Sequence, residues 1–247
     1  MKILLSGLCG HMGAEVINLI NKSGGEFTLV SGVDAFAGED TPVPCAKSFA
    51  AANPDCDCII DFSHHSLTGE LLKFAVRNRL PLVLATTAQT DGEKELIKAA
   101  AKEIPIFFAA NYSLGVALLI DLAKKAAAVM GDAEIEIVEA HHNRKLDAPS
   151  GTALAIAEGI KEVRPDAYIN CGRAGQGKRD KNEIGISSLR MGNVVGIHEV
   201  IIATDSQTIT LKHEAHSRAL FAEGALAAAK FLADKPAGLY DMKSILK

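Results

Sequence analysis

Aromatic side chains are scarce in this chain, and tryptophan is absent. Phenylalanine, tyrosine and tryptophan make up 5% of the 247 residues, and the formal net charge is −4 at pH 7. A platform that stacks single-stranded bases needs aromatic rings, and a nucleic-acid surface needs an excess of positive charge. The composition meets neither requirement, so we expect no nucleic-acid partner.

Cysteines are few, and their spacing forms no recognisable framework. The five are Cys9, Cys45, Cys56, Cys58 and Cys171. An odd number argues against a disulfide scaffold, and Cys56 and Cys58, with one residue between them, lack the usual zinc spacing. We therefore expect reduced thiols in the cytoplasm and no metal site.

Long hydrophobic runs are also missing. No apolar run approaches the roughly 20 residues that are needed to span a bilayer. The apolar stretch at residues 3–5 breaks into a glycine-rich turn, so we interpret it as a first strand and not as a signal peptide. We expect no membrane partner.

Short apolar runs alternate with helical patterns in the first half of the chain. The expected strands are residues 3–6, 28–33, 59–62, 82–85 and 106–109. The expected helices between them are residues 11–21, 66–77 and 92–102. Strands that are apolar on both faces and separated by helices are typical of a parallel sheet covered on both sides. The pattern predicts an α/β protein with a Rossmann-like, doubly wound nucleotide domain.

The pattern changes after residue 111. Residues 134–139 alternate polar and apolar side chains, which is typical of a strand with one wet face. Residues 200–203 and 208–211 flank a polar turn and predict a hairpin. We also expect a helix at residues 114–130, a long mobile loop at 171–179 and an alanine-rich helix at 218–233. The second half therefore predicts an α+β substrate domain with a mixed, open sheet.

The first predicted strand runs into Gly7-Leu8-Cys9-Gly10-His11-Met12-Gly13, a G-x-x-G-x-x-G sequence. Glycines let the backbone turn tightly and approach a pyrophosphate, and the following helix directs its N–H groups at that charge. The motif alone is weak, because glycines after a strand are common. The second strand is followed by Asp34, whose carboxylate can bind both ribose hydroxyls of NAD. The complete unit favours this role over a loop carboxylate or a helix cap.

Asp34 also bears on the choice of cofactor. NADP carries a phosphate where NAD has the 2′-hydroxyl, and a carboxylate repels that phosphate whereas an adjacent arginine attracts it. Asp34 is followed by Ala35 and Phe36, with no arginine nearby in the sequence. We predict that NADH is preferred and that NADPH is possible, since Lys47 could reach the site from a loop.

The carboxyl ends of the later strands should complete the cofactor site. Serine, threonine and asparagine at these places are equally suited to begin helices, and their shared location at strand ends favours the cofactor. The predicted cofactor-binding residues are Gly7, Leu8, Cys9, Gly10, His11, Met12, Asp34, Phe62, Ala85, Thr86, Thr87, Ala109, Ala110, Asn111 and Tyr112.

A second candidate site lies at residues 139–154. A strand delivers His141 and Lys145 into a loop, after which Ser150-Gly151-Thr152 opens a helix. A lysine and a helix start can hold carboxylates, and a histidine can give or take a proton near neutral pH. The alternatives are a solvated basic loop or a zinc site. The cluster beside a nucleotide fold favours the functional site, and His141 and His142, as strand neighbours, would face opposite sides, which argues against a shared metal.

This run resembles the substrate loop of the dihydrodipicolinate reductase family. The family shows E-x-H-H-x-x-K-x-D-x-P-S-G-T-A, which the chain matches from Glu139 to Ala153, and other segments along the whole chain resemble the family's motifs. The resemblance implies an NAD(P)H-dependent 4-hydroxy-tetrahydrodipicolinate reductase. Such an enzyme reduces a cyclic, unsaturated imine dicarboxylate to tetrahydrodipicolinate in diaminopimelate and lysine biosynthesis.

Roles for individual residues follow from the same resemblance. By matching position, His141 would be the acid/base residue and Lys145 the proton donor. The implied substrate-binding residues are His142, Ser150, Gly151 and Thr152. The resemblance also implies a homotetramer assembled through sheets of the substrate domain. Its implied domains are residues 1–112 with 219–247 for the dinucleotide, and 113–218 for substrate binding and oligomerisation.

Two departures from the family concern the cofactor end. The family usually has Gly-Thr-Thr-Gly where this chain has Ala85-Thr86-Thr87-Ala88, and His11 replaces the usual arginine of the glycine turn. The added methyl groups either crowd the nicotinamide or shift the loop. Rival interpretations are an aspartate or diaminopimelate dehydrogenase, which would not be expected to carry the run at 139–154, and a non-catalytic nucleotide sensor. Replacement of His141 or Lys145 would favour the sensor, and both are retained.

Overall fold

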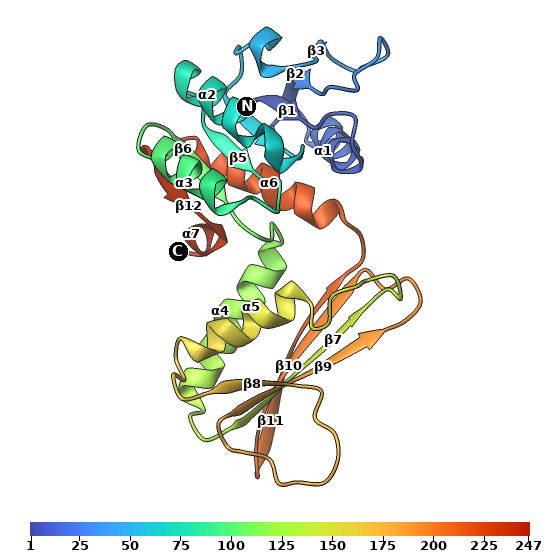
Figure 1. Ribbon diagram of the computed structural model, residues 1–247, viewed down its shortest axis with the longest axis vertical. Helices are drawn as coiled ribbons and strands as arrows, with labels where there is room; N and C mark the ends of the chain where they lie inside the picture. Colours follow the sequence, from blue (N-terminus) through green and yellow to red (C-terminus); the bar gives the residue numbers. More distant parts are fainter. The chain divides into compact units, whose positions relative to one another are not determined.

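A computed structural model describes residues 1–247, which divide into two compact units. Unit 1 comprises Met1–Ser113 and Arg218–Lys247, and unit 2 comprises Leu114–Ser217 (Figure 1). The chain therefore leaves unit 1, builds unit 2 and returns, so that unit 1 is discontinuous in sequence. The domain boundaries predicted from the sequence lie after residues 112 and 218.

Unit 1 is built on a seven-stranded sheet with the order β12-β6-β5-β4-β1-β2-β3. Every neighbouring pair in it is parallel. The strands are β1 (Lys2–Ser6), β2 (Thr28–Val33), β3 (Cys45–Ala46), β4 (Cys58–Asp61), β5 (Leu82–Leu84), β6 (Pro105–Phe108) and β12 (Gly238–Tyr240). The Rossmann-like parallel sheet predicted from the apolar runs is thus confirmed.

Helices cover both faces of this sheet. α1 (His11–Lys22) packs with α6 (Ala219–Leu232). α6 also packs on β6, where Phe231 meets Phe107 edge-on with ring centroids 6.1 Å apart. α2 (Thr68–Asn78) packs with α3 (Asp91–Ala100) over the other face. Because both faces are covered, the central strands are apolar except at their ends.

Unit 2 is built on a five-stranded mixed sheet with the order β11-β10-β7-β9-β8. β7 and β8 run parallel to β9, whereas β10 runs antiparallel to both β7 and β11. The strands are β7 (Glu134–His141), β8 (Tyr168–Cys171), β9 (Glu183–Arg190), β10 (Gly196–Thr204) and β11 (Gln207–Ala215). The predicted α+β arrangement with a mixed sheet is confirmed.

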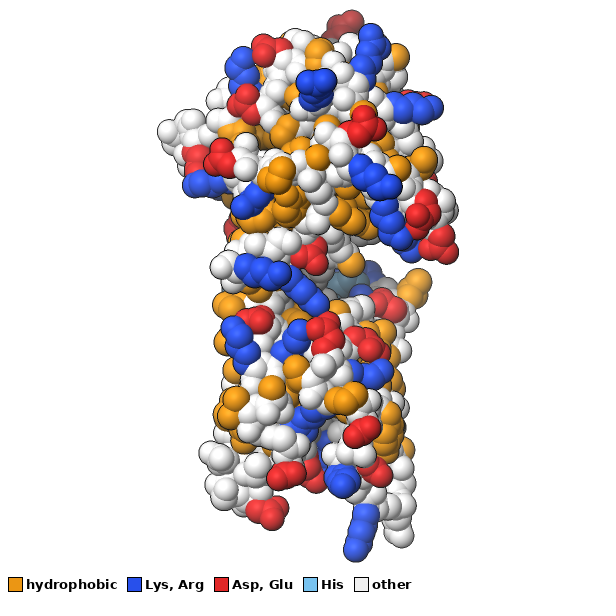
Figure 2. All heavy atoms as spheres, turned by 90° about the vertical axis from the view of Figure 1, so that its left-hand side faces the viewer, with side chains coloured by type: hydrophobic (Ala, Val, Ile, Leu, Met, Phe, Trp, Pro, Cys, Tyr) orange, Lys and Arg blue, Asp and Glu red, His pale blue; other side chains and the backbone are white.

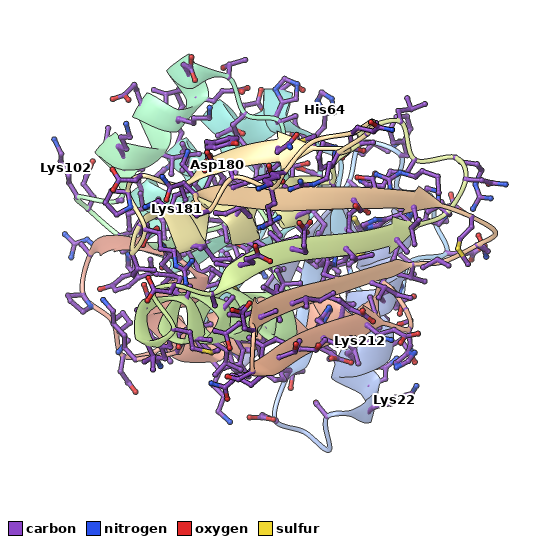
Figure 3. The ribbon with its side chains drawn as sticks, turned by 90° about the horizontal axis from the view of Figure 1, so that it is seen from below. Lys22, His64, Lys102, Asp180, Lys181 and Lys212 are labelled. Carbon is purple, nitrogen blue, oxygen red and sulfur yellow. The ribbon has the colours of Figure 1, made fainter.

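The helices α4 (Leu114–Val129) and α5 (Gly151–Lys161) lie together on one face of this sheet (Figure 1). Ile135 and Ile137 point into the core beneath them, whereas Glu134 and Glu136 alternate onto the other face. Seen from below, Lys212 lies on the β11 edge and the loop with Asp180 and Lys181 lies toward the β8 edge (Figure 3).

Several elements, most of them short, were not predicted from the sequence. They are the strands β3, β8, β9 and β12, the helical turns η1 (Phe49–Ala51) and η2 (His65–Leu67), and α7 (Met242–Ile245). β3 and β12 are too short to show a period. β9 changes from apolar to polar along its length, so its sequence does not alternate in the manner of a half-buried strand.

Acidic and basic side chains are interspersed over the face shown in Figure 2. None of the helices is both long and apolar enough to cross a bilayer.

Candidate functional site

The glycine turn of unit 1 is packed so tightly that only glycine fits at two of its positions. Gly7 has a φ of +80°, and a Cβ there would lie 2.5 Å from the carbonyl oxygen of Phe62. A Cβ at Gly13 would lie 2.4 Å from the carbonyl oxygens of both Gly7 and Leu8. The turn is therefore pressed against the end of β4 on one side and the start of α1 on the other.

The outer side of this turn is open. Cys9, Gly10 and His11 are exposed, and Gly10 caps α1 without a side chain. An open glycine turn followed by a helix start fits a pyrophosphate, since main-chain N–H groups and the helix dipole both favour negative charge there. The side chain of Leu8, in contrast, is buried, so this predicted residue can offer only its main chain.

Asp34 is held against the same turn. Its Oδ2 accepts the N–H of Cys9 at 2.9 Å, and its Oδ1 accepts the N–H of Phe36 at 2.9 Å. The carboxylate is thus fixed beside the turn, where we predict from the sequence that a ribose binds. The backbone N–H of Asp34 donates to the carbonyl of Ala46 at 2.9 Å. Lys47 is the next residue after Ala46, and it is exposed.

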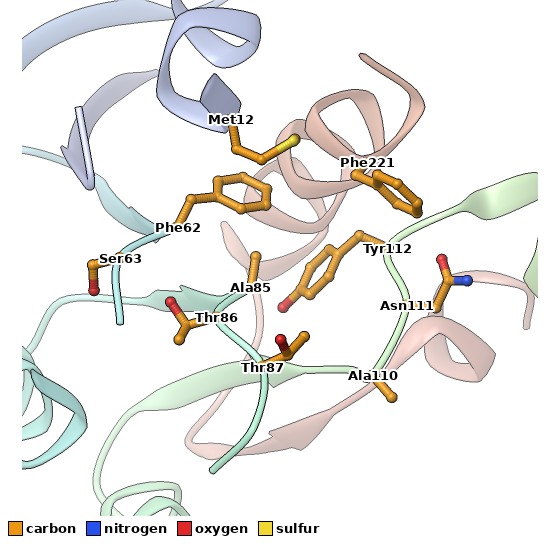
Figure 4. A pocket seen from close by; sticks show the side chains of 10 residues that line it. All are labelled: Met12, Phe62, Ser63, Ala85, Thr86, Thr87, Ala110, Asn111, Tyr112 and Phe221. Carbon is orange, nitrogen blue, oxygen red and sulfur yellow. The ribbon is translucent and has the colours of Figure 1, made fainter. Parts of the chain in front are cut away.

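A cavity of about 310 Å³ lies at the carboxyl ends of the strands in unit 1. Figure 4 shows the side chains around it. The lining residues are Met12, Phe62, Ser63, Ala85, Thr86, Thr87, Ala110, Asn111, Tyr112 and Phe221. All of them except Ser63 and Phe221 are among the predicted cofactor residues. Phe221 comes from α6. Local sequence patterns do not reveal that this helix returns to unit 1.

Several polar groups of this cavity already have protein partners. Asp61, which is buried, accepts from the hydroxyls of Ser63 and Thr86 at 2.6 Å each, and its burial raises the pKa of its carboxyl. The hydroxyl of Tyr112 donates to the carbonyl of Leu84 at 2.9 Å. These bonds fix the strand ends, so Thr86 and Tyr112 shape the cavity more than they offer free donors.

Ala88, one of the two alanines that replace family glycines, has a φ of +68°. An L-residue in this region costs about 1–2 kcal/mol, part of which glycine recovers at the expense of unfolded-state entropy. We expect Ala88→Gly to raise the free energy of unfolding by about 0.5–1 kcal/mol in chemical denaturation. Ala85→Gly is the matched control, because Ala85 has no positive φ and should lose about 1 kcal/mol. Equal losses in both variants would contradict strain at Ala88.

In unit 2, the loop after β7 is anchored to the turn between β9 and β10. The carbonyl of His141 accepts the N–H of Met191 at 2.9 Å, and the N–H of Asn143 donates to the carbonyl of Gly192 at 3.3 Å. Arg144 adds a bond from Nη2 to Oδ1 of Asn193 at 2.6 Å. Asn143 and Arg144 thus hold the loop in place.

Polar side chains form a row across the core-facing side of the sheet at this end. Glu139 on β7 lies opposite Ser188 on β9 and His198 on β10, and His198 lies opposite His213 on β11. The next row toward the other end of the sheet is apolar and contains Ile137. The row therefore marks where the hydrophobic core of unit 2 gives way to a polar site.

Glu139 is fully buried and accepts several hydrogen bonds. Arg190 donates through Nη1 to Oε2 at 2.9 Å and through Nη2 to Oε1 at 2.7 Å. Nδ1 of His141 lies 2.6 Å from Oε2, and the N–H of Ser150 donates to Oε1 at 3.1 Å. Burial alone would raise the pKa of the Glu139 carboxyl, but the bonds from Arg190, His141, Ser188 and Ser150 prevail and lower it to about 2.

His198 lies beside His141, with ring centroids 5.1 Å apart in an edge-to-face arrangement. Its Nε2 is 3.1 Å from Oγ of Ser150. Burial, followed by the nearby charge of His141, lowers the pKa of His198 to about 4, and Lys145 contributes in the same direction. The ring of His198 is thus neutral at pH 7. His198 and Arg190 belong to segments that resemble the family, but the sequence did not single them out for the site.

The start of α5 lies open next to this cluster. Ser150 caps the helix by accepting the N–H of Ala153 at 3.2 Å, so its hydroxyl is already hydrogen-bonded within the protein. Gly151 is exposed, and a Cβ there would meet nothing within 4 Å. Nζ of Lys145 lies 2.8 Å from Oδ1 of Asp147, and this bond lowers the pKa of Asp147. The open helix start can accept a carboxylate from solvent.

Two sequence profiles match the chain. The one described as "Dihydrodipicolinate reductase, N-terminus" matches residues 1–112, and the one described as "Dihydrodipicolinate reductase, C-terminus" matches residues 115–246. The chain is also 42% identical over 251 residues to the 4-hydroxy-tetrahydrodipicolinate reductase of Caldanaerobacter subterraneus subsp. tengcongensis, covering 100% of this chain and 98% of the relative.

Solved structures resemble the fold. A dipicolinate-bound dihydrodipicolinate reductase from Paenisporosarcina sp. TG-14 has a TM-score of 0.83 at 23% identity and covers 98% of this chain and 97% of its own. A diaminopimelate dehydrogenase from C. glutamicum in complex with DAP has a TM-score of 0.60 at 13% identity and covers 100% and 95%. At these identities the two structures support the architecture alone.

Proposed function

The chain belongs to the dihydrodipicolinate reductase family, and from this premise we propose which of its residues carry the reaction and which nicotinamide cofactor it prefers. The family reduces 4-hydroxy-tetrahydrodipicolinate in diaminopimelate and lysine biosynthesis, and it uses NAD(P)H. When bound, this cofactor supplies the hydride. The protein must then hold a dicarboxylate and deliver a proton to the atom next to the one reduced.

Unit 2 would hold the substrate. A dicarboxylate needs concentrated positive charge, and the observation that supports the site best is the open start of α5 at Gly151, which follows Lys145 along one anchored loop. We propose that Gly151 and Thr152 bind a carboxylate at the helix start, with His142 beside them. Ser150 would contribute by capping this helix, since its hydroxyl and N–H already bond to protein groups.

His141 and Lys145 would handle the proton. His141 sits at the end of β7 with one ring nitrogen bonded to a buried carboxylate, and Lys145 carries its ammonium group on the adjoining loop. We propose that Lys145 donates the proton and that His141 acts as the acid/base residue.

Unit 1 would hold the cofactor. The pyrophosphate would lie on the glycine turn at Gly7 and Gly10, the ribose at Asp34, and the nicotinamide in the cavity that Ala85 and Thr87 line. The test of the whole proposal is NADH or NADPH oxidation by purified protein, with the product of dihydrodipicolinate synthase as substrate. Absence of turnover with both cofactors would contradict it and would favour a nucleotide sensor.

We expect NADH to give a kcat/KM at least tenfold above that of NADPH, because Asp34 repels a 2′-phosphate (a tenfold change is about 1.4 kcal/mol). Asp34→Asn should lower this ratio by about tenfold, since the amide keeps the shape and loses the charge. Asp40→Asn removes an exposed carboxylate six positions further on and is the control. A wild-type preference for NADPH, for which Lys47 is the candidate cation, would contradict the assignment.

The outer face of the five-stranded sheet of unit 2 supports the proposed homotetramer. Leu189 is 47% exposed there, and Val138, Ile197 and Ile201 on the same face are half-buried. Apolar side chains on an open sheet face favour association with a second sheet. Light scattering should give four times the 26.1 kDa of one chain.

We also propose a cytoplasmic location, because all five cysteines are free, which suits a reducing compartment.

A further inference from the structure

One carboxylate links three elements of unit 2. Glu139 lies on β7, and its oxygens accept bonds from Arg190 on β9, from His141 on its own strand and from Ser150 at the start of α5. Its side chain is completely buried. A buried carboxylate in such a place is costly unless its lone pairs are satisfied, and here each oxygen accepts two bonds.

We propose that Glu139 is the positioning residue that fixes the tautomer of His141 and aligns the start of α5 with it. The inference rests on the role in proton transfer proposed for His141. Glu139 itself would not touch the substrate and would act through His141 and Ser150.

The tautomer follows from which groups can donate. An ionised carboxylate only accepts, so Nδ1 of His141, 2.6 Å from Oε2 of Glu139, must carry the hydrogen of that bond. The pKa of the Glu139 carboxyl is lowered to about 2, so this carboxyl is ionised at neutral pH. A neutral imidazole has one N–H, so Nε2 is left as the nitrogen that exchanges a proton. Nε2 faces Gly196, where a Cβ would lie 3.2 Å away.

The charges around His141 are arranged to leave Nε2 available. On β10 the ring of His198 is neutral, and on β11 burial lowers the pKa of His213, which faces His198. On β9 the guanidinium of Arg190 is neutralised by Glu139. On the adjoining loop, Lys145 is paired with Asp147 and Arg144 is bonded to Asn193.

A glutamine at position 139 could not replace the carboxylate. Oε1 accepts from Arg190 and Ser150, while Oε2 accepts from Arg190 and His141. An amide has one oxygen, so either orientation turns its NH₂ group toward two donors. With NH₂ toward His141, the ring must accept at Nδ1 and carry its hydrogen on Nε2. With the oxygen toward His141, the ring keeps its hydrogen on Nδ1, but the N–H of Ser150 loses its acceptor.

The first measurement is the ¹⁵N spectrum of the full-length wild-type protein, with His141 assigned by its loss in His141→Gln. We expect a protonated Nδ1 and an unprotonated Nε2 at a pH above the titration of the ring. A ring protonated at Nε2 would overturn the proposal. This measurement needs no substrate, so its result does not depend on whether the proposed function is correct.

The second measurement compares Glu139→Gln with Glu136→Gln, which lies on the same strand but on its other face, beside Arg179. In Glu139→Gln we expect kcat/KM to fall about 10²-fold, with the NADH dissociation constant unchanged. The limb of the pH–rate profile that reports protonation of the ring should move to lower pH, because an adjacent negative charge is lost. Glu136→Gln should leave both unchanged.

Glu139→Asp keeps the charge and should recover part of the activity and the wild-type limb of the pH profile. An unchanged pH profile and tautomer in Glu139→Gln would contradict a positioning role, whatever the loss of activity. If Glu139→Gln fails to fold, the wild-type spectrum and the Glu139→Asp profile decide the question.

Discussion

Replacement of Lys145 by alanine should lower kcat about 10³-fold while the NADH dissociation constant stays within about twofold. A positioned proton donor contributes to the transition state alone, whereas the cofactor is expected to contact unit 1. The side chain of Lys145 is 23% exposed, and its Nζ is held 2.8 Å from Asp147 at the edge of the loop. Stopped-flow absorbance of NADH oxidation gives the first quantity, and NADH fluorescence titration gives the second.

Lys161→Ala is the matched control for this prediction. Lys161 lies in the last turn of α5, where its Nζ pairs with Glu158 at 3.2 Å on the surface. Its loss should change kcat by less than about twofold, because exposed ion pairs contribute little. Equal losses of turnover and cofactor affinity in Lys145→Ala would contradict the role of proton donor and point to a general disturbance of the protein.

Gly13→Ala should reduce the free energy of unfolding by about 3 kcal/mol. The new methyl group would lie 2.4 Å from the carbonyl oxygens of Gly7 and Leu8. Both obstacles are backbone atoms, so no side-chain rotation relieves the clash, and the turn must separate from α1. Urea denaturation followed by circular dichroism measures the loss, and the NADH affinity should fall together with it.

Gly10→Ala, three residues earlier in the same turn, is the control. A Cβ there would lie 3.4 Å from its nearest neighbour, the carbonyl oxygen of Gly7, which is ordinary contact. Its stability should stay within about 1 kcal/mol of wild type. A loss as large as that of Gly13→Ala would show that the turn requires glycine for a reason other than this close approach.

The apolar runs of the sequence predicted the longer strands of the seven-stranded sheet of unit 1 well, because a strand buried on both faces is mostly apolar. Their ends differ by one residue, as at β4, which covers Cys58–Asp61 where residues 59–62 were expected. The hairpin of unit 2 was also found, although β10 and β11 are longer and leave only Asp205 and Ser206 between them. β9 escaped detection because its second half is polar where it enters the site.

The candidate cofactor site was accessible to sequence reasoning for a similar reason. Gly7 and Asp34 lie at the ends of adjacent parallel strands, and the topology of such a sheet places those ends side by side. The cavity in unit 1 consequently gathers most of the residues predicted for it. Ser63 and Phe221 were not predicted for it, and Phe221 reaches the cavity only because α6 packs back onto unit 1.

The sequence by itself determined the parallel sheet, the glycine turn, and the loop that carries His141 and Lys145, because these depend on periods and turn chemistry within a few residues. Only the tertiary structure decided what surrounds His141. Arg190 and His198 are 49 and 57 residues further along the chain, and the register of β7 with β9 and β10 brings them to Glu139. Strand register is a long-range property, set by which faces the core buries, so local sequence could indicate His141 and its strand but not the arginine and the second histidine that converge on them.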